Sequence, residues 1–454
     1  MDSMTDEERQ PAPRGPRRAV KLAVVAASLL FGLLACELLL RAAGYTYPLF
    51  YEPDETRGYA LRPAAAGLYR KEGRAFARIN SDGLRDREHE RPKPAGTFRV
   101  ALLGDSYAEA LQVEQHEAFW SVAEGLMGDC APAGARRVEF VNFGVSGYGT
   151  AQELLTLRER VWAYEPDLVL LAVTTNNDLT DNTRALKGTD EIPYFVFRDG
   201  ELVLDDSFRR DAAFRWRASL PSRLGRWLRE RLRFVQAAHE AQVALKAALA
   251  ARRERTAARE AANPAEAAQT AATNPAEAAP AAGPSTPVGA PGAAPNAEAP
   301  PGAAKAEAPP AAELGTANMI YAEPQDELWR GAWQVTEFLV SAMHREVAAR
   351  GARFVVVTLS NPIQAHPDPE AREAFARRLG VRDLFYPERR FKALGDREGF
   401  PVISLAPDMQ AHAEANRVFL HGFPPDLGNG HWNQTGHRVA GRLLAPQLCA
   451  AAIR

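Results

Sequence analysis

The chain has few cysteines and almost no net charge, and each shortage excludes a class of protein. Only three cysteines occur among 454 residues, and none has the spacing to histidine or to another cysteine that a metal site needs. Lys and Arg number 55 and Asp and Glu 57, so the net charge is −2 and shows no bias toward nucleic acid. The sequence therefore predicts no metal, no other cofactor and no nucleic-acid partner, and an apolar fraction of 46% makes a globular core feasible.

One long apolar run lies near the N-terminus. Residues 22–36 are uncharged and consist mostly of Leu, Ala and Val, and residues 38–40 extend the run beyond Glu37. This length is near the minimum for one membrane span. A basic cluster precedes the run and should stay in the cytoplasm, which places everything after Arg41 outside it. The first expectation is an uncleaved signal anchor.

Two other interpretations of this run stay open. A cleaved signal peptide is possible because the uncharged run is close to signal length. A lipoprotein signal is the third, because Leu33 to Cys36 resembles a lipobox. All three place the bulk of the chain outside the cytoplasm, where disulfides can form. Cys130 and Cys449 either form a disulfide or remain as two buried thiols.

From Arg99 onward the sequence alternates between short apolar runs and helical patterns, which is typical of a parallel sheet covered on both faces. The apolar run at residues 167–173 is nearly continuous, as a strand buried on both faces requires. The predicted fold is α/β, a flavodoxin-like three-layer sandwich with a parallel sheet. Its predicted strands are 99–103, 138–142, 167–173, 353–359 and 401–405, and its main predicted helices are 116–127, 150–164, 326–350 and one at the C-terminus.

Three segments interrupt this alternation. Residues 194–204 predict a β-hairpin with a type I′ turn at Asp199-Gly200. Residues 214–258 are helical and rich in Arg, Leu and Ala. Residues 259–316 are a low-complexity stretch of Ala, Pro, Glu and Gly that predicts a disordered insertion. The expected segments are a cytoplasmic tail at 1–18, a transmembrane signal anchor at 19–41, lead-in strands packed on the main domain at 42–97, the first part of the main domain at 98–180, the hairpin and basic helical insertion at 181–258, the disordered linker at 259–316, and the second part of the main domain at 317–454.

Four loops carry residues suited to acyl chemistry: Ser106, Gly147, Asn177 and His431. The first three follow predicted strands of one parallel sheet, so they can converge at the same edge. A serine hydroxyl needs a base to become a nucleophile, and histidine is the usual one. Backbone amides of Ser106 and Gly147 and the side-chain amide of Asn177 are suitable donors to an oxyanion.

In these loops the sequence resembles the SGNH (GDSL-type) hydrolase family. The first family block is present as Gly104-Asp105-Ser106, the second as residues 142–147 (NFGVSG), the third as residues 175–178 (TNND), and the last around His431 (HWNQTGH). The resemblance covers residues 50–180 and 318–450 and is closest to membrane-anchored bacterial members. It implies that Ser106 is the nucleophile, His431 the base, and Gly147 and Asn177 the oxyanion donors beside the Ser106 amide.

The sequence departs from the family pattern at the triad acid. The family has Asp three residues before the histidine, where this chain has Gly428. Asp426 is the first candidate for the acid, because a glycine-rich loop can fold back. Asn429 can orient the imidazole through a neutral contact, although it would not stabilise an imidazolium. A Ser–His dyad that uses a backbone carbonyl is the third possibility.

Several neighbouring residues are assigned structural roles. Asp105 braces the serine turn and Asp178 buttresses the loop that holds Asn177. His437 packs inside the last helix, and His421 is expected at the surface or in a loop. Trp432 either lines the substrate site or is buried beside it.

The predicted function is serine-dependent acyl-ester hydrolysis through an acyl-enzyme. The resemblance implies a bacterial inner-membrane protein with one span and its catalytic domain on the periplasmic side. The expected substrate is an ester-bearing small molecule or an acylated envelope glycan. Two alternatives remain: O-acetyl transfer to, or deacetylation of, a cell-envelope polysaccharide, and a non-catalytic envelope binding module that keeps the fold.

Overall fold

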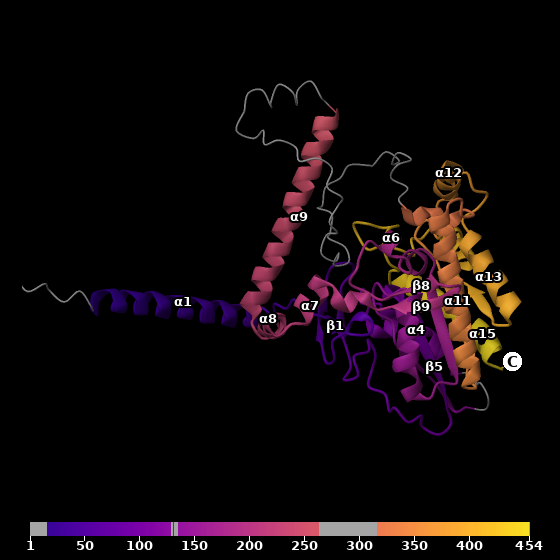
Figure 1. The fold of residues 1–454 in the computed structure, drawn as a ribbon, viewed down its shortest axis with the longest axis horizontal. Helices are drawn as coiled ribbons and strands as arrows, with labels where there is room; N and C mark the ends of the chain where they lie inside the picture. The colour runs from indigo at the N-terminus through magenta and orange to yellow at the C-terminus, as the bar shows by residue number, and fades with distance from the viewer. Residues whose placement is uncertain (1–15, 129, 131–134, 263–315, 454) are drawn as a thin grey trace, which may run out of the picture. The chain divides into compact units, whose positions relative to one another are not determined.

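The computed structural model describes residues 16–128, 130, 135–262 and 316–453 (Figure 1). The chain divides into two compact units. One consists of Met1–Tyr47 and Leu224–Ala258, and the other of Pro48–Arg223 and Arg259–Arg454. The second contains all four loops singled out from the sequence, and it is called the catalytic unit below after the chemistry that the sequence predicts for these loops.

A five-stranded parallel sheet forms the centre of the catalytic unit. Its strand order is β11-β10-β7-β5-β6, so the chain starts at β5, next to one edge, steps to that edge at β6, and then returns past β5 and continues to the other edge. This is the flavodoxin-like order, and the predicted α/β three-layer fold is confirmed. The strands are β5 (Thr97–Gly104), β6 (Arg137–Asn142), β7 (Leu168–Thr174), β10 (Arg353–Leu359) and β11 (Val402–Ser404).

Both faces of this sheet are buried, which explains the continuous apolar runs. Along β7, Leu168, Leu170 and Ala172 pack into one core, and the alternate residues Val169 and Leu171 pack into the other. The first core is completed by α3 (Phe119–Met127), α14 (Ala406–Asn416) and α15 (Gln434–Ile453), and the second by α4 (Thr150–Glu159), α11 (Glu327–Ala349) and α13 (Tyr386–Glu398).

The segment before the sheet contains two small antiparallel hairpins. Its apolar residues, including Leu61 and Ile79, share a third core with Leu111, Val145 and Tyr148, which lie close in sequence to Ser106 and Gly147. This packing attaches the hairpins to the edge of the sheet where the predicted site lies. The hairpins are β1 (Tyr51–Asp54) with β2 (Gly58–Leu61), and β3 (Ala66–Tyr69) with β4 (Ala75–Arg78).

The predicted hairpin after the third strand of the sheet is present as β8 (Tyr194–Arg198) and β9 (Glu201–Asp205). Asp199 and Gly200 have φ values of +53° and +84°, as a type I′ turn requires. The helical stretch that follows is divided into α7 (Ala212–Ala218), α8 (Leu220–Arg231) and α9 (Arg233–Ala262).

One sequence expectation for this unit needs correction, the length of the helix expected at 150–164. The helix after Ser106 is a single turn, α2 (Ser106–Glu109), because Ala110 adopts a left-handed conformation and ends it. The helix expected at 150–164 ends at Glu159, and a separate 3-10 helix follows over Val161–Tyr164. The N-cap of the helix that begins at Thr150 is Gly149. The remaining short helices are the 3-10 helices Gln115–Glu117, Ser207–Arg210 and Thr316–Tyr321 and the α-helices α5 (Asn177–Thr180), α6 (Arg184–Lys187) and α12 (Pro369–Leu379).

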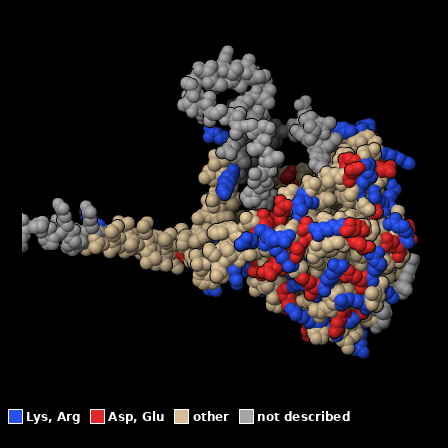
Figure 2. All heavy atoms as spheres, viewed as in Figure 1, with Lys and Arg blue, Asp and Glu red and all other residues tan. Residues whose placement is uncertain are grey.

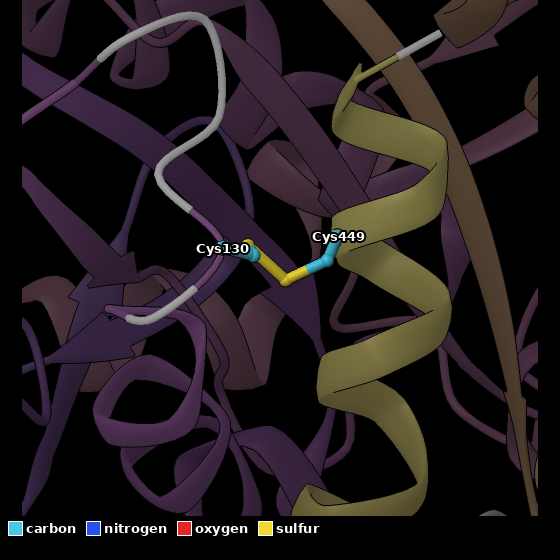
Figure 3. Close-up of a disulfide and its surroundings, with 2 residues drawn as sticks. All are labelled: Cys130 and Cys449. Carbon is cyan, nitrogen blue, oxygen red and sulfur yellow. A yellow bond between two sulfur atoms is a disulfide. The ribbon is translucent and has the colours of Figure 1, made fainter.

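A disulfide joins the two cysteines of the catalytic unit (Figure 3). Cys130 follows α3 and Cys449 lies on α15, with their Cα atoms 6.1 Å apart. Of the two arrangements left open by the sequence, the structure therefore has the disulfide. The bond connects residues 319 positions apart in the chain.

The other unit begins with α1 (Pro16–Ala42), a continuous helix. Residues Ala19–Ala42 have a mean hydropathy of 2.4, and the helix is long and apolar enough to cross a membrane. Figure 2 shows its surface as almost uniformly tan, in contrast to the mixed blue and red of the catalytic unit. This composition is that of a membrane anchor or a signal sequence. The predicted tail at 1–18 and disordered insertion at 259–316 lie largely outside the described residues.

Candidate active site

Ser106 lies on the sharp connection between β5 and α2. The strand ends at Gly104, and the Asp105 carboxylate caps α2 by accepting the Tyr107 amide at 3.0 Å. A Cβ atom at Gly104 would come within 2.8 Å of the Ala108 side chain, so the turn is too tight for another residue. The turn presents the Ser106 hydroxyl at the carboxyl edge of the sheet.

His431 lies within hydrogen-bond distance of this hydroxyl. The distance from His431 Nε2 to Ser106 Oγ is 2.7 Å. His431 comes from the loop before α15, whose start is capped by the Asn433 side chain through the Gly436 amide at 3.0 Å. The two residues are 325 positions apart in the chain, and their contact is the one that proton transfer from serine to histidine requires.

Glu72 provides the carboxylate on the other side of the imidazole. Its Oε2 lies 2.5 Å from His431 Nδ1, and its Oε1 accepts the His431 backbone amide at 2.6 Å. Glu72 lies in the turn between β3 and β4, so the lead-in hairpin reaches into the site. A carboxylate in this position holds the imidazole in one tautomer with Nε2 facing the serine.

The electrostatics of this pair favour the charged forms of both groups. Burial alone would raise the pKa of Glu72, but hydrogen bonds from His431 and its charge outweigh burial and lower that pKa below its usual value. Burial alone would lower the pKa of His431, and the hydrogen bond and charge of Glu72 outweigh it and raise that pKa. The imidazolium formed during proton transfer is therefore stabilised.

Asp426 does not take the position that the sequence assigned to it. Its exposed carboxylate accepts the Asn429 side-chain amide at 2.8 Å, and the structure gives it no contact with His431. Asn429 is engaged in the same bond and does not orient the imidazole. The structure brings Glu72 to His431 instead, from 359 positions away in the chain. No local spacing around His431 could reveal such a partner.

The second block packs directly on α2. A Cβ atom at Gly144 would come within 2.5 Å of the Ala108 side chain, and the Ser146 amide donates to Glu109 Oε2 at 2.6 Å. Gly147 has a φ of +77°, and a Cβ atom there would come within 2.7 Å of the Tyr59 hydroxyl. Only glycine therefore fits this position of the loop.

Asn177 begins α5 and is tied to the serine turn. Its side-chain Nδ2 donates to Asp105 Oδ2 at 2.9 Å, and Thr174 donates its hydroxyl to the other oxygen of Asp105 at 3.0 Å. A side-chain amide has two N–H groups, and one of them satisfies Asp105. The other takes part in no hydrogen bond among the described residues and is available to an oxyanion.

The carboxylates near these loops act as braces. Asp105 accepts three hydrogen bonds, and Asp178 accepts the Thr174 amide at 2.7 Å. Burial and the negative charge of Asp105 raise the pKa of Asp178. Both residues hold the loop backbones, in agreement with the roles assigned to them from the sequence.

Glu109 is a site residue that the sequence analysis missed. It is fully buried one turn after Ser106, where it accepts the Ser146 amide and the Tyr51 hydroxyl, the latter at 2.9 Å. Burial raises the pKa of this carboxyl to about 7, although hydrogen bonds from Ser146 and Tyr51 oppose the rise. The signal available was an acidic residue three positions after the serine within an otherwise apolar stretch.

His421 was expected at the surface or in a loop, and it lies in the loop between α14 and α15 but not at the surface. His421 is buried behind the catalytic loop, with Nδ1 3.0 Å from the Gly430 carbonyl and Nε2 3.0 Å from Ser360 Oγ. Burial lowers its pKa to about 3, so the ring is neutral and donates from Nδ1 to Gly430. Trp432 is also fully buried and donates to the same Ser360 hydroxyl at 2.9 Å. Both side chains fix the backbone on either side of His431.

His437 is also buried, which fits the packing role expected of it. Its ring is stacked on Phe119, and its Nδ1 accepts the Phe119 amide at 3.2 Å. Among the described residues, no group of three or more His, Cys, Asp or Glu side chains could hold a metal ion.

Comparison with known proteins gives structural likeness only. A scan of family models matches none to this chain, and a search of curated proteins gives no match. Similar solved structures include a catalytic mutant of Axe2, an acetylxylan esterase from Geobacillus stearothermophilus, with 10% identity over 79% of this chain and 96% of that one and a TM-score of 0.33. The acetyl xylan esterase AlAXEase has 12% identity over 77% of this chain and 100% of its own, with a TM-score of 0.33. A protein described as lipolytic and of the G-D-S-L family, from Desulfitobacterium hafniense DCB-2, has 9% identity over 77% of this chain and 98% of its own, with a TM-score of 0.30. At these identities and TM-scores the likeness carries no information about the function of this chain.

Proposed function

We propose that this chain is a serine-dependent acyl-ester hydrolase of the SGNH type that acts outside the cytoplasm. The observation that carries the proposal is the continuous contact from Ser106 Oγ to His431 Nε2 and from His431 Nδ1 to Glu72. A nucleophile, a base and a carboxylate in this order are the parts that acyl transfer through an acyl-enzyme needs.

The reaction starts when His431 Nε2 takes the hydroxyl proton of Ser106 and Oγ attacks the ester carbonyl. The negative charge on the carbonyl oxygen is held by the amides of Ser106 and Gly147 and by the free N–H of Asn177. As the intermediate collapses, the bond to the alcohol oxygen breaks, and His431 returns its proton to that oxygen. An acyl group is then attached to Ser106.

Deacylation repeats these steps with water. His431 takes a proton from the water, whose oxygen attacks the acyl carbonyl, and the proton then returns to Ser106 Oγ as the carboxylic acid leaves. Glu72 stays ionised throughout and stabilises the imidazolium in both halves of the reaction.

The extracytoplasmic location is supported by two features. The apolar helix α1 is preceded by basic residues, the arrangement that keeps the N-terminal flank in the cytoplasm. The Cys130–Cys449 disulfide is typical of oxidising compartments. We infer a single-pass anchor in a bacterial inner membrane, with an ester-bearing small molecule or an acylated envelope glycan as the substrate class.

The binding-module alternative loses its main support. Gly428 in place of the family aspartate would favour a protein without catalysis, but Glu72 supplies a carboxylate to His431 by another route. No observation favours O-acetyl transfer over hydrolysis, since both use the same residues.

The test is turnover of p-nitrophenyl acetate by the full-length protein in detergent. Ser106→Ala and His431→Ala should each abolish turnover, and mass spectrometry of the wild type should find an acetyl group on the peptide that contains Ser106. Wild-type turnover equal to that of Ser106→Ala, with no acetylated peptide, would contradict the proposal.

A further inference from the structure

Helix α8 exposes an apolar stripe that has no partner in the described structure. Leu220, Leu224, Trp227 and Leu228 recur at the spacing of one helical face and are 74%, 58%, 47% and 38% exposed. Arg231 covers one side of the indole of Trp227, with its guanidinium 4.8 Å from the ring centroid. Scattered exposed leucines are common in proteins, but a continuous stripe that includes a tryptophan marks an interaction surface.

On the side of α8 opposite the stripe, two arginines are partly buried. Arg226 and Arg229 are only partly exposed, and burial lowers the pKa of the Arg229 guanidinium. Arg223 lies beside the apolar stripe and Arg231 at its C-terminal end, and both remain exposed. An ordinary surface helix buries its apolar side and exposes its charges, so α8 is built for an environment that is not bulk water.

Residues Leu224–Arg231 of α8 belong to the same unit as α1, and their contacts identify that environment. The Arg41 side chain, near the end of α1, donates a hydrogen bond of 2.6 Å to the backbone carbonyl of Arg231, the last residue of α8. At the start of α9, the Phe234 amide donates to Glu37 Oε2 at 3.0 Å, and Glu37 also pairs with Arg41 at 2.7 Å. Glu37, which is costly in lipid, is therefore satisfied by Arg41 of α1 and by the Phe234 amide of α9. The junction of α8 and α9 lies beside the last turns of α1 (Figure 1).

We propose that α8 is an amphipathic helix that lies in the outer surface of a phospholipid bilayer, next to the point where α1 leaves it. Leu220, Leu224 and Leu228 enter the boundary of the acyl chains, and Trp227 occupies the interface that tryptophan favours. Arg223 and Arg231 reach the phosphates of acidic lipids from the edges of the stripe. The proposal rests on α1 being a membrane span, as in the proposed function, and adds a second membrane contact.

The experiment measures the depth of Trp227 in the membrane. The full-length protein is reconstituted into vesicles of phosphatidylcholine and phosphatidylglycerol, with or without a phosphatidylcholine brominated near the top of its acyl chain. The contribution of Trp227 is the difference in emission between the wild type and Trp227→Phe. We expect brominated lipid to remove most of this contribution and aqueous iodide to leave it largely intact.

Two variants provide controls. Trp329→Phe removes a tryptophan buried in the catalytic unit and should leave the bromine-dependent loss unchanged. The double variant Leu224→Glu, Leu228→Glu should reduce the loss in Trp227 emission while p-nitrophenyl acetate turnover stays at the wild-type rate, because neither residue contacts the catalytic groups.

Vesicle flotation separates the two ways in which the proposal can fail. If the protein floats with the vesicles but Trp227 is quenched by iodide and not by bromine, α1 spans the membrane and the proposal for α8 is wrong. If Trp227 is protected from both quenchers, protein covers the stripe, for example a second copy of the chain, and the proposal is again wrong. If the protein does not float, the anchor itself fails and the inference fails with it.

Discussion

At the residue scale, the most consequential side chain is Glu72, because it binds His431 twice and comes from a segment outside the sheet. Glu72→Gln keeps the size of the side chain but removes the charge that stabilises the imidazolium. We expect kcat for p-nitrophenyl acetate to fall by about 10²- to 10⁴-fold, with a smaller effect on KM.

Asp426→Asn is the matched control for this change. Both variants replace a carboxylate by an amide, but Asp426 contacts Asn429 and not His431. The turnover of Asp426→Asn should therefore equal that of the wild type. A large loss in Asp426→Asn with none in Glu72→Gln would reverse the assignment of the acid.

The same contact sets the pH dependence of the reaction. His431 acts as a base only when it is neutral, so turnover rises as pH passes through its pKa. Glu72 raises that pKa, so the rise in the wild type should lie above 6.5, the ordinary value for histidine. In Glu72→Gln the rise in turnover should occur at lower pH, and the maximum turnover reached above it should be smaller. A pH profile of kcat/KM for both proteins measures the shift, and an unchanged midpoint would show that Glu72 does not act through His431.

At the element scale, an ion cluster fastens the lead-in segment to the sheet. His89 lies between two carboxylates, with Nε2 3.1 Å from Asp86 and Nδ1 2.9 Å from Glu139 of β6. Asp86 also accepts the amide of Asn142, the first residue of the second block, at 2.9 Å. The cluster therefore holds both the lead-in segment and a catalytic loop against the sheet.

This cluster predicts a loss of stability at alkaline pH. Burial alone would lower the pKa of His89, but Asp86 and Glu139 outweigh it and raise the pKa from 6.5 to about 9. The unfolded chain releases this proton at lower pH than the folded one, so the stabilisation is complete below 6.5 and is lost as pH rises through 9. The difference is at most about 3 kcal/mol. Thermal unfolding across this window should show a falling Tm in the wild type and a flatter profile in His89→Gln. Parallel profiles would show that another group is responsible.

The elements also show where sequence reasoning succeeds and where it stops. The strands of the sheet were predictable because burial on both faces demands continuous apolar runs, and β7 is one of them. The turn at Ser106 and the loop at Gly147 were also predictable, because each needs glycine at a fixed position and the sequence has glycine there. Glu72 and His421 gave no such signal. The role of Glu72 arises from contact with a segment hundreds of residues away, and the role of His421 arises from its burial. A polar turn between two short strands looks the same whether or not it meets a histidine.

At the scale of the whole molecule, the disulfide closes the catalytic unit by tying the end of α3 to α15. These two helices pack in the same core on one face of the sheet, and α15 directly follows the loop that carries His431. The covalent link restricts the unfolded chain across 319 positions, so its removal should favour unfolding. The folded core holds the same helices together without it, so the geometry of the site should persist.

We therefore expect the double variant Cys130→Ala, Cys449→Ala to lose about 2–5 kcal/mol of unfolding free energy while keeping its turnover of p-nitrophenyl acetate at moderate temperature. Cys36→Ala, which removes the exposed cysteine of α1, is the control and should leave the stability of the catalytic unit unchanged. Denaturant unfolding of the three proteins measures the difference, and a reducing agent should bring the wild type down to the double variant. Equal midpoints would mean that the noncovalent packing of α3 on α15 alone sets the stability. A loss of turnover without a loss of stability would mean that the bond positions the His431 loop.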